Sequence, residues 1–490
     1  MDAGRHPRQA TLLAIVFLLN GTEFLQSGMM AFGAGAIMGQ VGAAPEDFVM
    51  VTVLYAAVAV TTVAMQHWLV ERIGWRAYIG LSALLFAGGA AIAGSSVGVA
   101  QFMLGRAVMA AGGAGFMTAA RLLINLIAPG PQRMKGIGAF GLSLALGNAL
   151  APWLAASAVD IECWPLMFAV PAAMALTAAL LARGVLPTEL APAGIRSETA
   201  AWVPLTIFGA SFSGLYALQR AAFDFYDDPA IMLLCLTLCA AGALLVIRRQ
   251  LRDARPLLAV RALLHVRYLA GLALFALCYL ILGANNALLP VLLQRALLAP
   301  FTAIGALQSL GLLSSVLAFV LMLAVMKRSP APRKFHVAGF GFLAYFAWQL
   351  ARLDTGANLA ADVLPAIAAF GVFLILVLAT TAIHTFTGLQ GDPVGFNHGQ
   401  MVKNMGSQFG IALGVAGSTV ALQWRIGEHY TLLAERLNQA ALAAAPQALA
   451  QLAQTVNQQA ALLAGIDYFK ALMALALAAA LAMALQRVFK

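Results

Sequence analysis

The sequence predicts an all-α membrane protein with fourteen transmembrane helices, arranged as two six-helix halves plus two inserted helices. Of the 490 residues, 62% are hydrophobic and only 10% are charged, whereas soluble domains have roughly 45–50% apolar and about 25% charged residues. Apolar windows recur along the whole chain, and basic residues gather in alternate connections between them. This composition excludes a soluble enzyme, a disordered chain and a secreted disulfide scaffold.

The transmembrane windows follow from length, because a helix needs about 20 mostly apolar residues to cross a bilayer. Gly and Ala recur throughout these windows, which suits the close packing of helices in lipid. The expected spans are 11–38, 48–69, 77–97, 100–127, 136–158, 163–183, 201–219, 229–247, 268–293, 302–326, 335–352, 362–388, 399–424 and 466–487.

Basic residues set the expected orientation. If the N-terminus is cytoplasmic and the spans alternate, 20 of the 29 Lys and Arg residues lie in inner segments and six lie in outer ones. This asymmetry follows the positive-inside rule. It predicts a multi-pass protein of the cell inner (plasma) membrane with both termini in the cytoplasm. It also accounts for the net charge of +10 without a nucleic-acid partner.

The spans divide into three groups. Residues 1–185 hold the first six spans, residues 186–267 form a linker with two extra spans, and residues 268–490 hold the last six. Duplicated six-span halves are typical of transporters, in which the substrate site lies between the halves. We therefore expect a transporter whose cavity lies between the first and third groups.

The segment 425–465 is the longest polar stretch of the chain, and alternation of the spans places it on the outer side. Ala, Gln and Leu dominate it, so its helix propensity is high, and Pro446 is expected to divide it into two short helices. Two interpretations remain open. The segment is either a solvated helical hairpin with no special role or a docking surface for a partner such as a periplasmic adaptor protein.

The connection between the second and third spans carries a recognisable motif. Residues 67–78 read HWLVERIGWRAY, in which Glu71, Arg72, Gly74 and Arg76 make a tight turn flanked by charges that can pair with helix ends. The segment resembles the motif G-x-L-x-D-R-x-G-R-R of the major facilitator superfamily, with Glu in place of Asp. The resemblance implies the major facilitator fold and a role for these four residues in bracing helices and gating the cytoplasmic side.

Two further spans strengthen this resemblance. In span five, Gly147 and Pro152 match the antiporter motif of exporting members, where small residues and a proline bend let helices pivot. In span thirteen, FNHGQMVKNMGSQFGIALG is similar to a segment of the fourteen-span drug:proton antiporter branch, with Lys403 in place of Arg. The polar segment 425–465 also resembles Emr-type inner-membrane multidrug exporters of this branch. Export of small molecules is therefore what the resemblance implies.

Glu23 and Arg106 are the candidates for proton coupling. Glu23 shares one face of the first span with Asn20, and removal of a carboxyl group from water favours its protonated form. Arg106 stands where the family motif R-x-x-Q-G has its arginine, and a guanidinium inside the membrane costs roughly 2.5 kcal/mol or more. A cation near Glu23 would oppose its protonation, so the pair could load and release a proton.

Other polar residues within the spans are the expected lining of the substrate cavity. Buried amides need hydrogen-bond partners, and the Lys403 ammonium needs a partner or water. The predicted cavity residues are Asn20, Gln26, Asn148, Asn285, Asn286 and Lys403.

Three function classes are compatible with these features. The first is proton-coupled export, by antiport, of hydrophobic or amphipathic small molecules. The second is a proton-coupled uptake symporter for an organic anion drawn in by Arg106 and Lys403. The third is a membrane scaffold, sensor or enzyme.

The motifs that the chain lacks weigh against an enzyme. The sequence contains no HExxH, no phosphate-binding loop, no nucleophile elbow and no cluster of metal ligands. We therefore expect no enzymatic activity, no cofactor and no metal. The expected partners are a small-molecule substrate, protons and membrane lipid, with an ion gradient as the energy source.

Overall fold

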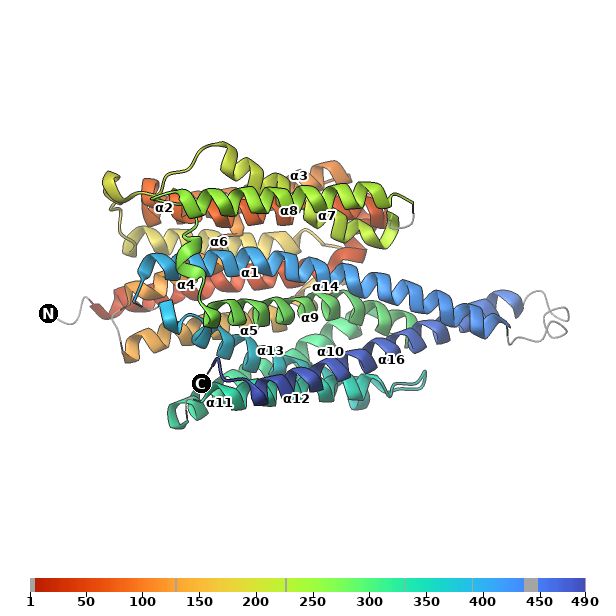
Figure 1. The fold of residues 1–490 in the computed structure, drawn as a ribbon. Helices are drawn as coiled ribbons and strands as arrows, with labels where there is room; N and C mark the ends of the chain where they lie inside the picture. Colours follow the sequence, from red (N-terminus) through yellow and green to blue (C-terminus); the bar gives the residue numbers. More distant parts are fainter. Residues whose placement is uncertain are drawn as a thin grey trace.

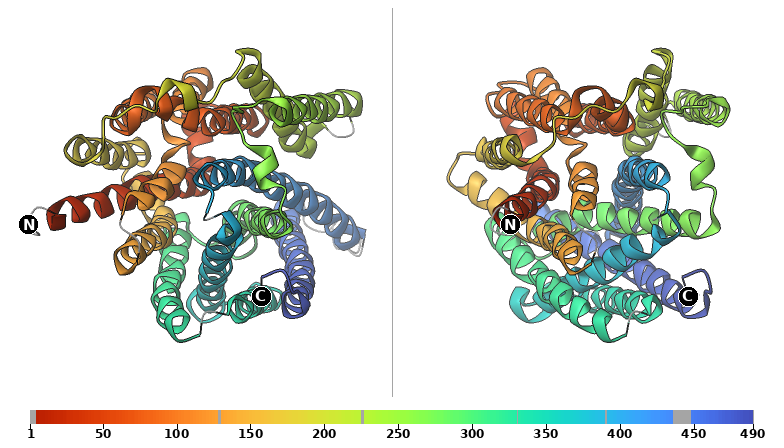
Figure 2. Two further views of the ribbon diagram at one scale, coloured as in Figure 1. Left: turned by 60° about the vertical axis from the view of Figure 1, so that its left-hand side comes forward. Right: turned by 90° about the vertical axis from the view of Figure 1, so that its left-hand side faces the viewer.

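The computed structural model describes residues 5–127, 130–224, 227–329, 331–389, 391–435 and 448–489, and these ranges contain helices and no strand. The long helices lie side by side in one bundle (Figures 1 and 2). In chain order they are α1 (Arg5–Val41), α2 (Pro45–Gly94), α3 (Val99–Gly113), α4 (Phe116–Leu123), α5 (Pro131–Asp160), α6 (Leu166–Val185), α7 (Trp202–Asp224), α8 (Pro229–Arg252), α9 (Val266–Ala296), α10 (Phe301–Leu312), α11 (Ser314–Arg328), α12 (Pro332–Leu350), α13 (Leu364–Thr385), α14 (Pro393–Glu435) and α16 (Ala448–Leu485).

Short turns of helix connect or extend several of these elements. They are η1 (Ile124–Leu126), η2 (Ala193–Ile195), η3 (Val260–Leu263), η4 (Leu359–Val363) and η5 (Thr387–Leu389).

Eleven helices of the described ranges are long and apolar enough to cross a membrane. In this set α3, α4 and η1 together form one span, and α10 and α11 together form another. Helix α2 counts as a single span, and α7 and α12 are not in the set. Helices suit this environment because each one satisfies its own backbone hydrogen bonds where no water is present. The expectation of an all-helical membrane protein is confirmed.

The long helix α2 is bent back on itself at Gly74. This glycine has φ 78° and ψ 162°, a backbone conformation that other residues rarely adopt. Gln66 before the bend donates to the Gly115 carbonyl oxygen at 3.1 Å, and the Tyr78 hydroxyl after the bend lies against the same glycine. The two arms of α2 therefore pack side by side on α3 and α4.

Glycines set the closest approach between α9 and α14. A Cβ atom at Gly414 would lie 2.1 Å from the Leu280 carbonyl oxygen, and one at Gly283 would lie 2.4 Å from the Ile411 carbonyl oxygen. Such positions bring two backbones into direct contact, which is how helices gain packing energy in lipid. Gly410 and Gly414, four residues apart in the thirteenth predicted span, therefore pack against α9.

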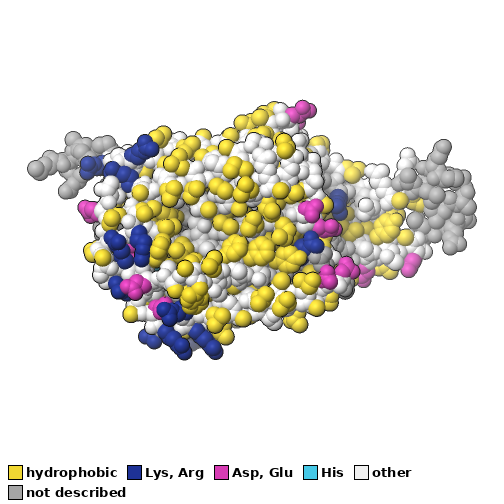
Figure 3. All heavy atoms as spheres, turned by 90° about the horizontal axis from the view of Figure 1, so that it is seen from above, with side chains coloured by type: hydrophobic (Ala, Val, Ile, Leu, Met, Phe, Trp, Pro, Cys, Tyr) yellow, Lys and Arg dark blue, Asp and Glu magenta, His cyan; other side chains and the backbone are white. Residues whose placement is uncertain are grey.

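Charged side chains lie at the two ends of the bundle, with a hydrophobic surface between them (Figure 3). Lys and Arg gather at the end where α1 begins, and most of the visible Asp and Glu side chains lie toward the other end. The distribution of Lys and Arg agrees with the asymmetry of basic residues that the sequence predicts. The start of α1 and the end of α16 lie toward the same end of the bundle (Figure 1).

The polar segment 425–465 does not fold into two separate short helices. Its first part continues α14 to Glu435, and its last part belongs to α16, which begins at Ala448. The two extensions project together beyond the bundle, at the end opposite the start of α1 (Figure 1). Arg425 and Asp467 form an ion pair between them, and His429 Nε2 lies 2.8 Å from Asp467 Oδ2. Pro446, the expected breakpoint, lies outside the described residues.

The contact between α9 and α14 makes a testable prediction. Gly414→Ala should destabilise the protein by about 1–3 kcal/mol, because overpacking forces backbones apart. Gly417→Ala is the matched control, since a Cβ atom there meets nothing within 4 Å and alanine favours the helix by roughly 0.5–1 kcal/mol. Melting temperatures of the purified variants test this. Equal melting temperatures for the two variants would contradict the close contact.

Candidate functional site

A buried polar cluster joins α1, α2 and α3. Arg106 of α3 is 4% exposed, and its Nη1 donates to Gln26 Oε1 of α1 at 3.0 Å. Gln26 Nε2 in turn donates to the Tyr55 hydroxyl of α2 at 2.7 Å. The Arg106 guanidinium carbon lies 4.1 Å from the Tyr55 ring centroid, which places the cation over the ring face. Arg106 thus has an amide and an aromatic ring as partners.

Small residues hold Arg106 in this position. A Cβ atom at Gly105 would lie 2.5 Å from the Ala93 backbone nitrogen, and one at Gly89 would lie 2.4 Å from the Met109 backbone nitrogen. The second arm of α2 and helix α3 therefore touch backbone to backbone. This contact packs one side of α3 against α2 and leaves Arg106 on the side that meets α1.

Glu23 lies in the same region but makes no strong bond. It is 9% exposed, and its Oε2 atom has no hydrogen-bond partner among the described residues. Arg106 is within electrostatic range of Glu23, yet it directs its hydrogen bond to Gln26. Glu23 is also within electrostatic range of Tyr279 on α9. Its carboxyl group is therefore buried, has one oxygen atom without a hydrogen-bond partner among the described residues, and lies within electrostatic range of groups on α3 and α9.

The predicted amides take separate places. Asn20 is fully buried and donates to the Phe140 carbonyl oxygen and to Ser143 Oγ, both at 2.8 Å, so that it ties α1 to α5. Asn285 is buried and donates to the Ile281 carbonyl oxygen of its own helix, while its Oδ1 has no partner among the described residues. Asn148 and Asn286 are half-buried. None of these four, nor Gln26, lines the cavity described next.

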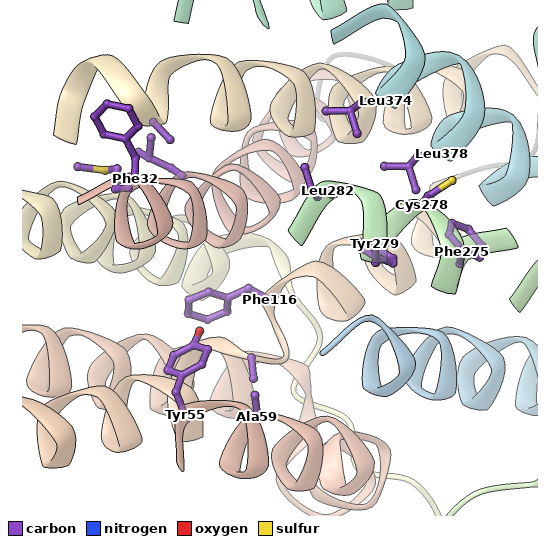
Figure 4. Packing of buried hydrophobic residues seen from close by; sticks show 14 of the residues in the cluster. Phe32, Tyr55, Ala59, Phe116, Phe275, Cys278, Tyr279, Leu282, Leu374 and Leu378 are labelled. Atoms are coloured by element: carbon purple, nitrogen blue, oxygen red, sulfur yellow. The ribbon is translucent and has the colours of Figure 1, made fainter. Parts of the chain in front are cut away.

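A cavity of about 70 Å³ lies between helices from distant parts of the chain. Side chains of α4 and α5 line it on one side, and side chains of α9, α11, α13 and α14 line the other. Most of the lining is apolar, and Figure 4 shows Phe275 and Tyr279 of α9 near Leu378 of α13. The polar lining groups are Arg121, Gln400 and Lys403, together with the Tyr279 hydroxyl.

Lys403 is the one predicted cavity residue that lines this space. It is 7% exposed, its Nζ lies 4.0 Å from Met117 Sδ and 5.3 Å from the Phe275 ring centroid. Its neighbour Asn404 donates to Thr118 Oγ1 of α4, which fixes this part of α14. Its partners are thus a sulfur atom and a ring face, and no carboxylate of the described residues pairs with it.

The motif between the arms of α2 forms hydrogen bonds with the segment that follows α6. Glu71 Oε2 accepts hydrogen bonds from the Ser197 backbone N–H at 2.8 Å and from its hydroxyl at 2.5 Å. Arg72 donates to the Ser197 carbonyl oxygen at 2.9 Å, and Arg76 donates to the Leu186 carbonyl oxygen at 3.0 Å. The sequence led us to expect pairing with helix ends. Arg76 meets this expectation, because Leu186 is the C-cap residue of α6. Glu71 and Arg72 instead bind the linker at Ser197, which no sequence pattern indicated.

Next to the proline of α5, a backbone N–H bonds to another helix. Pro152 lies inside α5 and has no backbone N–H of its own. The next N–H, that of Trp153, bonds to Ser309 Oγ of α10 at 2.8 Å. A Cβ atom at Gly147 would lie 2.9 Å from Phe24 Cβ, so α5 also touches α1 closely. Both motif residues thus sit where α5 meets a neighbour.

Sequence reasoning missed several residues of these sites. Tyr55 and Tyr279 lie in apolar windows with nothing to distinguish them from packing aromatics, and Ser197 lies in the linker. Gln400 carried a usable signal, since it precedes Lys403 by three positions and so shares its helix face. Arg121 was visible near the end of the fourth predicted span, although its place in the cavity depends on the tertiary fold.

Comparison with known proteins gives relatives of the same kind. An uncharacterized MFS-type transporter of Bacillus subtilis (strain 168), YhcA, is 24% identical over 448 residues, which are 90% of this chain and 82% of that protein. The uncharacterized transporter YebQ of Escherichia coli (strain K12) is 25% identical over 219 residues, which are 44% of this chain and 47% of that protein.

Solved structures of similar fold are transporters. A bacterial homologue of the human lysosomal transporter Spinster, inward-facing and unoccupied, gives a TM-score of 0.61 with 13% identity, over 99% of this chain and 98% of that one. An auto-inhibited POT family peptide transporter gives 0.60 with 17% identity, over 97% and 96%. At these identities the likeness concerns the fold alone.

The family itself follows from the sequence profile. The profile of the Major Facilitator Superfamily matches residues 16–426, which include both arms of α2, the buried cluster and every helix that lines the cavity. The motif around Gly74, the helical bundle and the similar transporters agree with that match. The chain therefore belongs to the Major Facilitator Superfamily, and it is a multi-pass membrane transporter and not an enzyme.

Proposed function

We propose that this transporter exports hydrophobic or amphipathic small molecules in exchange for protons. The observation that carries the proposal is Glu23, a buried carboxyl group whose Oε2 has no partner among the described residues. An ionisable group kept inside a membrane bundle is typical of a proton path. Arg106 lies close enough to oppose protonation, and it donates a hydrogen bond to Gln26 and forms no ion pair with Glu23 among the described residues.

We propose fourteen spans arranged as two halves and an inserted pair. The two arms of α2, together with α7 and α12, raise the eleven candidate spans to fourteen. An even number is also what a bundle needs when its first and last helices start and end on the same side (Figure 1). The halves are residues 1–185 and 268–490, and residues 186–267 carry the inserted pair α7 and α8.

Transport then takes place by alternating access between these halves. The cavity is lined from both of them, and its volume of about 70 Å³ is well below the 300–1,000 Å³ of typical ligand sites. A substrate therefore requires the halves to part. The basic end of the bundle faces the cytoplasm of a cell inner membrane in this proposal, by the positive-inside rule. The proposal includes no periplasmic adaptor, because the relatives and structures named above give no support for one.

Export is the proposed direction because of α5. The Trp153 N–H, next to Pro152, bonds to α10, and Gly147 brings α5 against α1. A helix that is bonded to neighbours on both sides at a proline bend is a suitable pivot for the two halves. The resemblance of this region to exporting members of the superfamily supports the same direction.

Uptake of an organic anion together with protons is the second candidate. It is favoured by the two cations, Arg121 and Lys403, that line the cavity without an acidic residue among the lining side chains. Protonation of Glu23 removes a negative charge, so it would raise the affinity of the cavity for an anion, and a bound anion would in turn favour protonation of Glu23. That linkage favours movement of both in the same direction.

Glu23→Gln tests the proton path. The substitution keeps the shape of the side chain and removes its titration, so we expect substrate-induced proton flux to fall at least about tenfold, a barrier increase of about 1.4 kcal/mol. The measurement uses sealed proteoliposomes with a trapped pH dye, to which lipophilic cations and weak acids are added in turn.

Glu46→Gln is the control for this experiment, because Glu46 is an exposed carboxylate in the first turn of α2. It should retain wild-type flux. Wild-type flux in Glu23→Gln would remove Glu23 from the proton path. Protons that move with the substrate, and not against it, would replace the exporter with the uptake symporter.

We propose that Glu71 gates the transporter by holding the linker at Ser197, and Glu71→Ala tests this role. Loss of the carboxylate leaves the Ser197 N–H and hydroxyl without their acceptor, and a hydrogen bond to a charged group contributes about 1.5–3 kcal/mol. Hydrogen exchange of the peptide that contains Ser197 should therefore quicken about tenfold or more, and transport should slow. Glu189→Ala, an exposed acid of the same linker, should change neither. Unchanged exchange in Glu71→Ala would show that other contacts hold the linker.

A further inference from the structure

The charge of the cavity is unbalanced. Its lining includes two basic side chains, Arg121 and Lys403, and no Asp or Glu. Rings and a sulfur atom lie beside these cations. The Arg121 guanidinium carbon lies 5.2 Å from the Phe396 ring centroid, and Lys403 contacts Met117 and Phe275. Ring faces attract cations but do not neutralise them. The cavity therefore carries a positive potential.

Lys403 is placed where an unpaired charge is most costly. It is 7% exposed, and no oxygen atom of the described residues accepts a hydrogen bond from its Nζ. A buried ammonium gains stability when a hydrogen-bonded counter-ion replaces the water that it has lost. Because the lining supplies no such counter-ion, a ligand that brings one would bind with a large electrostatic gain.

Three donors converge on the space from two sides. Gln400 and Lys403 are three residues apart on α14 and share one helix face. Arg121 reaches the cavity from α4, in the other proposed half. An oxyanion between them can accept hydrogen bonds from an amide, an ammonium and a guanidinium, and bonds between ions are stronger than bonds between neutral groups. Such a ligand would also link the two halves.

The remainder of the lining suits an apolar body. Phe140 of α5, Phe275 of α9 and Phe319 of α11 border the cavity together with aliphatic side chains of α13. Aromatic and aliphatic walls with a few converging donors are the usual composition of small-molecule sites. A cationic amphiphile would meet the same walls but would be repelled by both basic groups.

We propose that this cavity, widened as the two halves part, binds an amphipathic organic anion. Its carboxylate or sulfonate group bonds to Lys403, Gln400 and Arg121, and its aromatic or aliphatic body lies against the phenylalanine walls. The proposal rests on the proposed function in one respect only, namely that the cavity is the transport site. It names the substrate class, and it holds for either direction of transport.

Binding of three matched probes tests the proposal. Naphthoate, naphthylmethanol and naphthylmethylammonium share one ring system and differ in charge. Equilibrium dialysis against the purified protein in lipid nanodiscs, with empty nanodiscs subtracted, measures each of them near neutral pH. Naphthoate should bind saturably and at least about tenfold more tightly than the ammonium probe. Lys403→Met should weaken naphthoate at least about tenfold and change naphthylmethanol by less than about twofold, and Lys403→Arg should retain most of the binding.

Two controls separate binding from structure. Lys334→Met removes a half-buried lysine that lies outside the cavity lining and donates to the Ser329 carbonyl oxygen, and it should leave naphthoate binding unchanged. In the absence of ligand, Lys403→Met should match or exceed the melting temperature of the wild type, because it removes an uncompensated buried charge. A marked fall in melting temperature would show that Lys403 stabilises the fold, and it would contradict a role in ligand binding.

Three other results would overturn the proposal. They are equal or tighter binding of the ammonium probe, absence of saturable naphthoate binding to the wild type, and naphthoate binding that Lys403→Met leaves intact. The dialysis contains no proton gradient, so its outcome is independent of proton coupling. Saturable naphthoate binding in a protein whose Glu23→Gln variant keeps wild-type proton flux would retain the anion site and reject the proton path.

Discussion

The cost of a charge inside a low-dielectric bundle governs the interior of this transporter. Three of its buried ionisable groups meet that cost in different ways. Arg106 bonds to Gln26 and stacks on Tyr55, whereas Lys403 contacts a sulfur atom and a ring among the described residues. Glu23 has an oxygen atom without a partner among the described residues. Arg106 has the most partners of the three, although its Nε also lacks a hydrogen-bond partner among the described residues. The other two groups mark the proposed proton path and the proposed anion site.

Glycine contacts make this distribution of charge possible. Close backbone approach between the second arm of α2 and α3 positions Arg106, and the same kind of contact between α9 and α14 sets the distance of Lys403 from Phe275. In lipid, packing of this kind is a main source of helix association, since apolar side chains gain nothing by leaving a lipid tail for a neighbouring helix. The small residues therefore stabilise the fold and fix the geometry of the charged groups together.

The turn at Gly74 connects the bundle to its linker. Glu71 and Arg72 hold Ser197 through side-chain and backbone bonds. His67, one turn before Glu71 and 3.2 Å from its carboxylate, also lies 5.0 Å, ring centroid to ring centroid, from His398 of α14. The motif thus touches the linker and the start of α14 at once. A movement of the halves that separated α2 from α14 would strain both contacts, which suits the gating role that we propose.

The sequence by itself determined that the helices lie in a membrane, and it determined the class of fold and the family. Long apolar windows admit only membrane helices where backbone groups lack water, and residues 67–78 carried the superfamily motif in contiguous sequence. The tertiary structure alone decided which polar residues meet. Asn20 bonds to Phe140, 120 positions away, and so serves packing, while Lys403 reaches the cavity wall shared with Arg121. Helical periodicity assigns a residue to a face of its own helix, but the partner of that face depends on how distant helices pack, which no local pattern encodes.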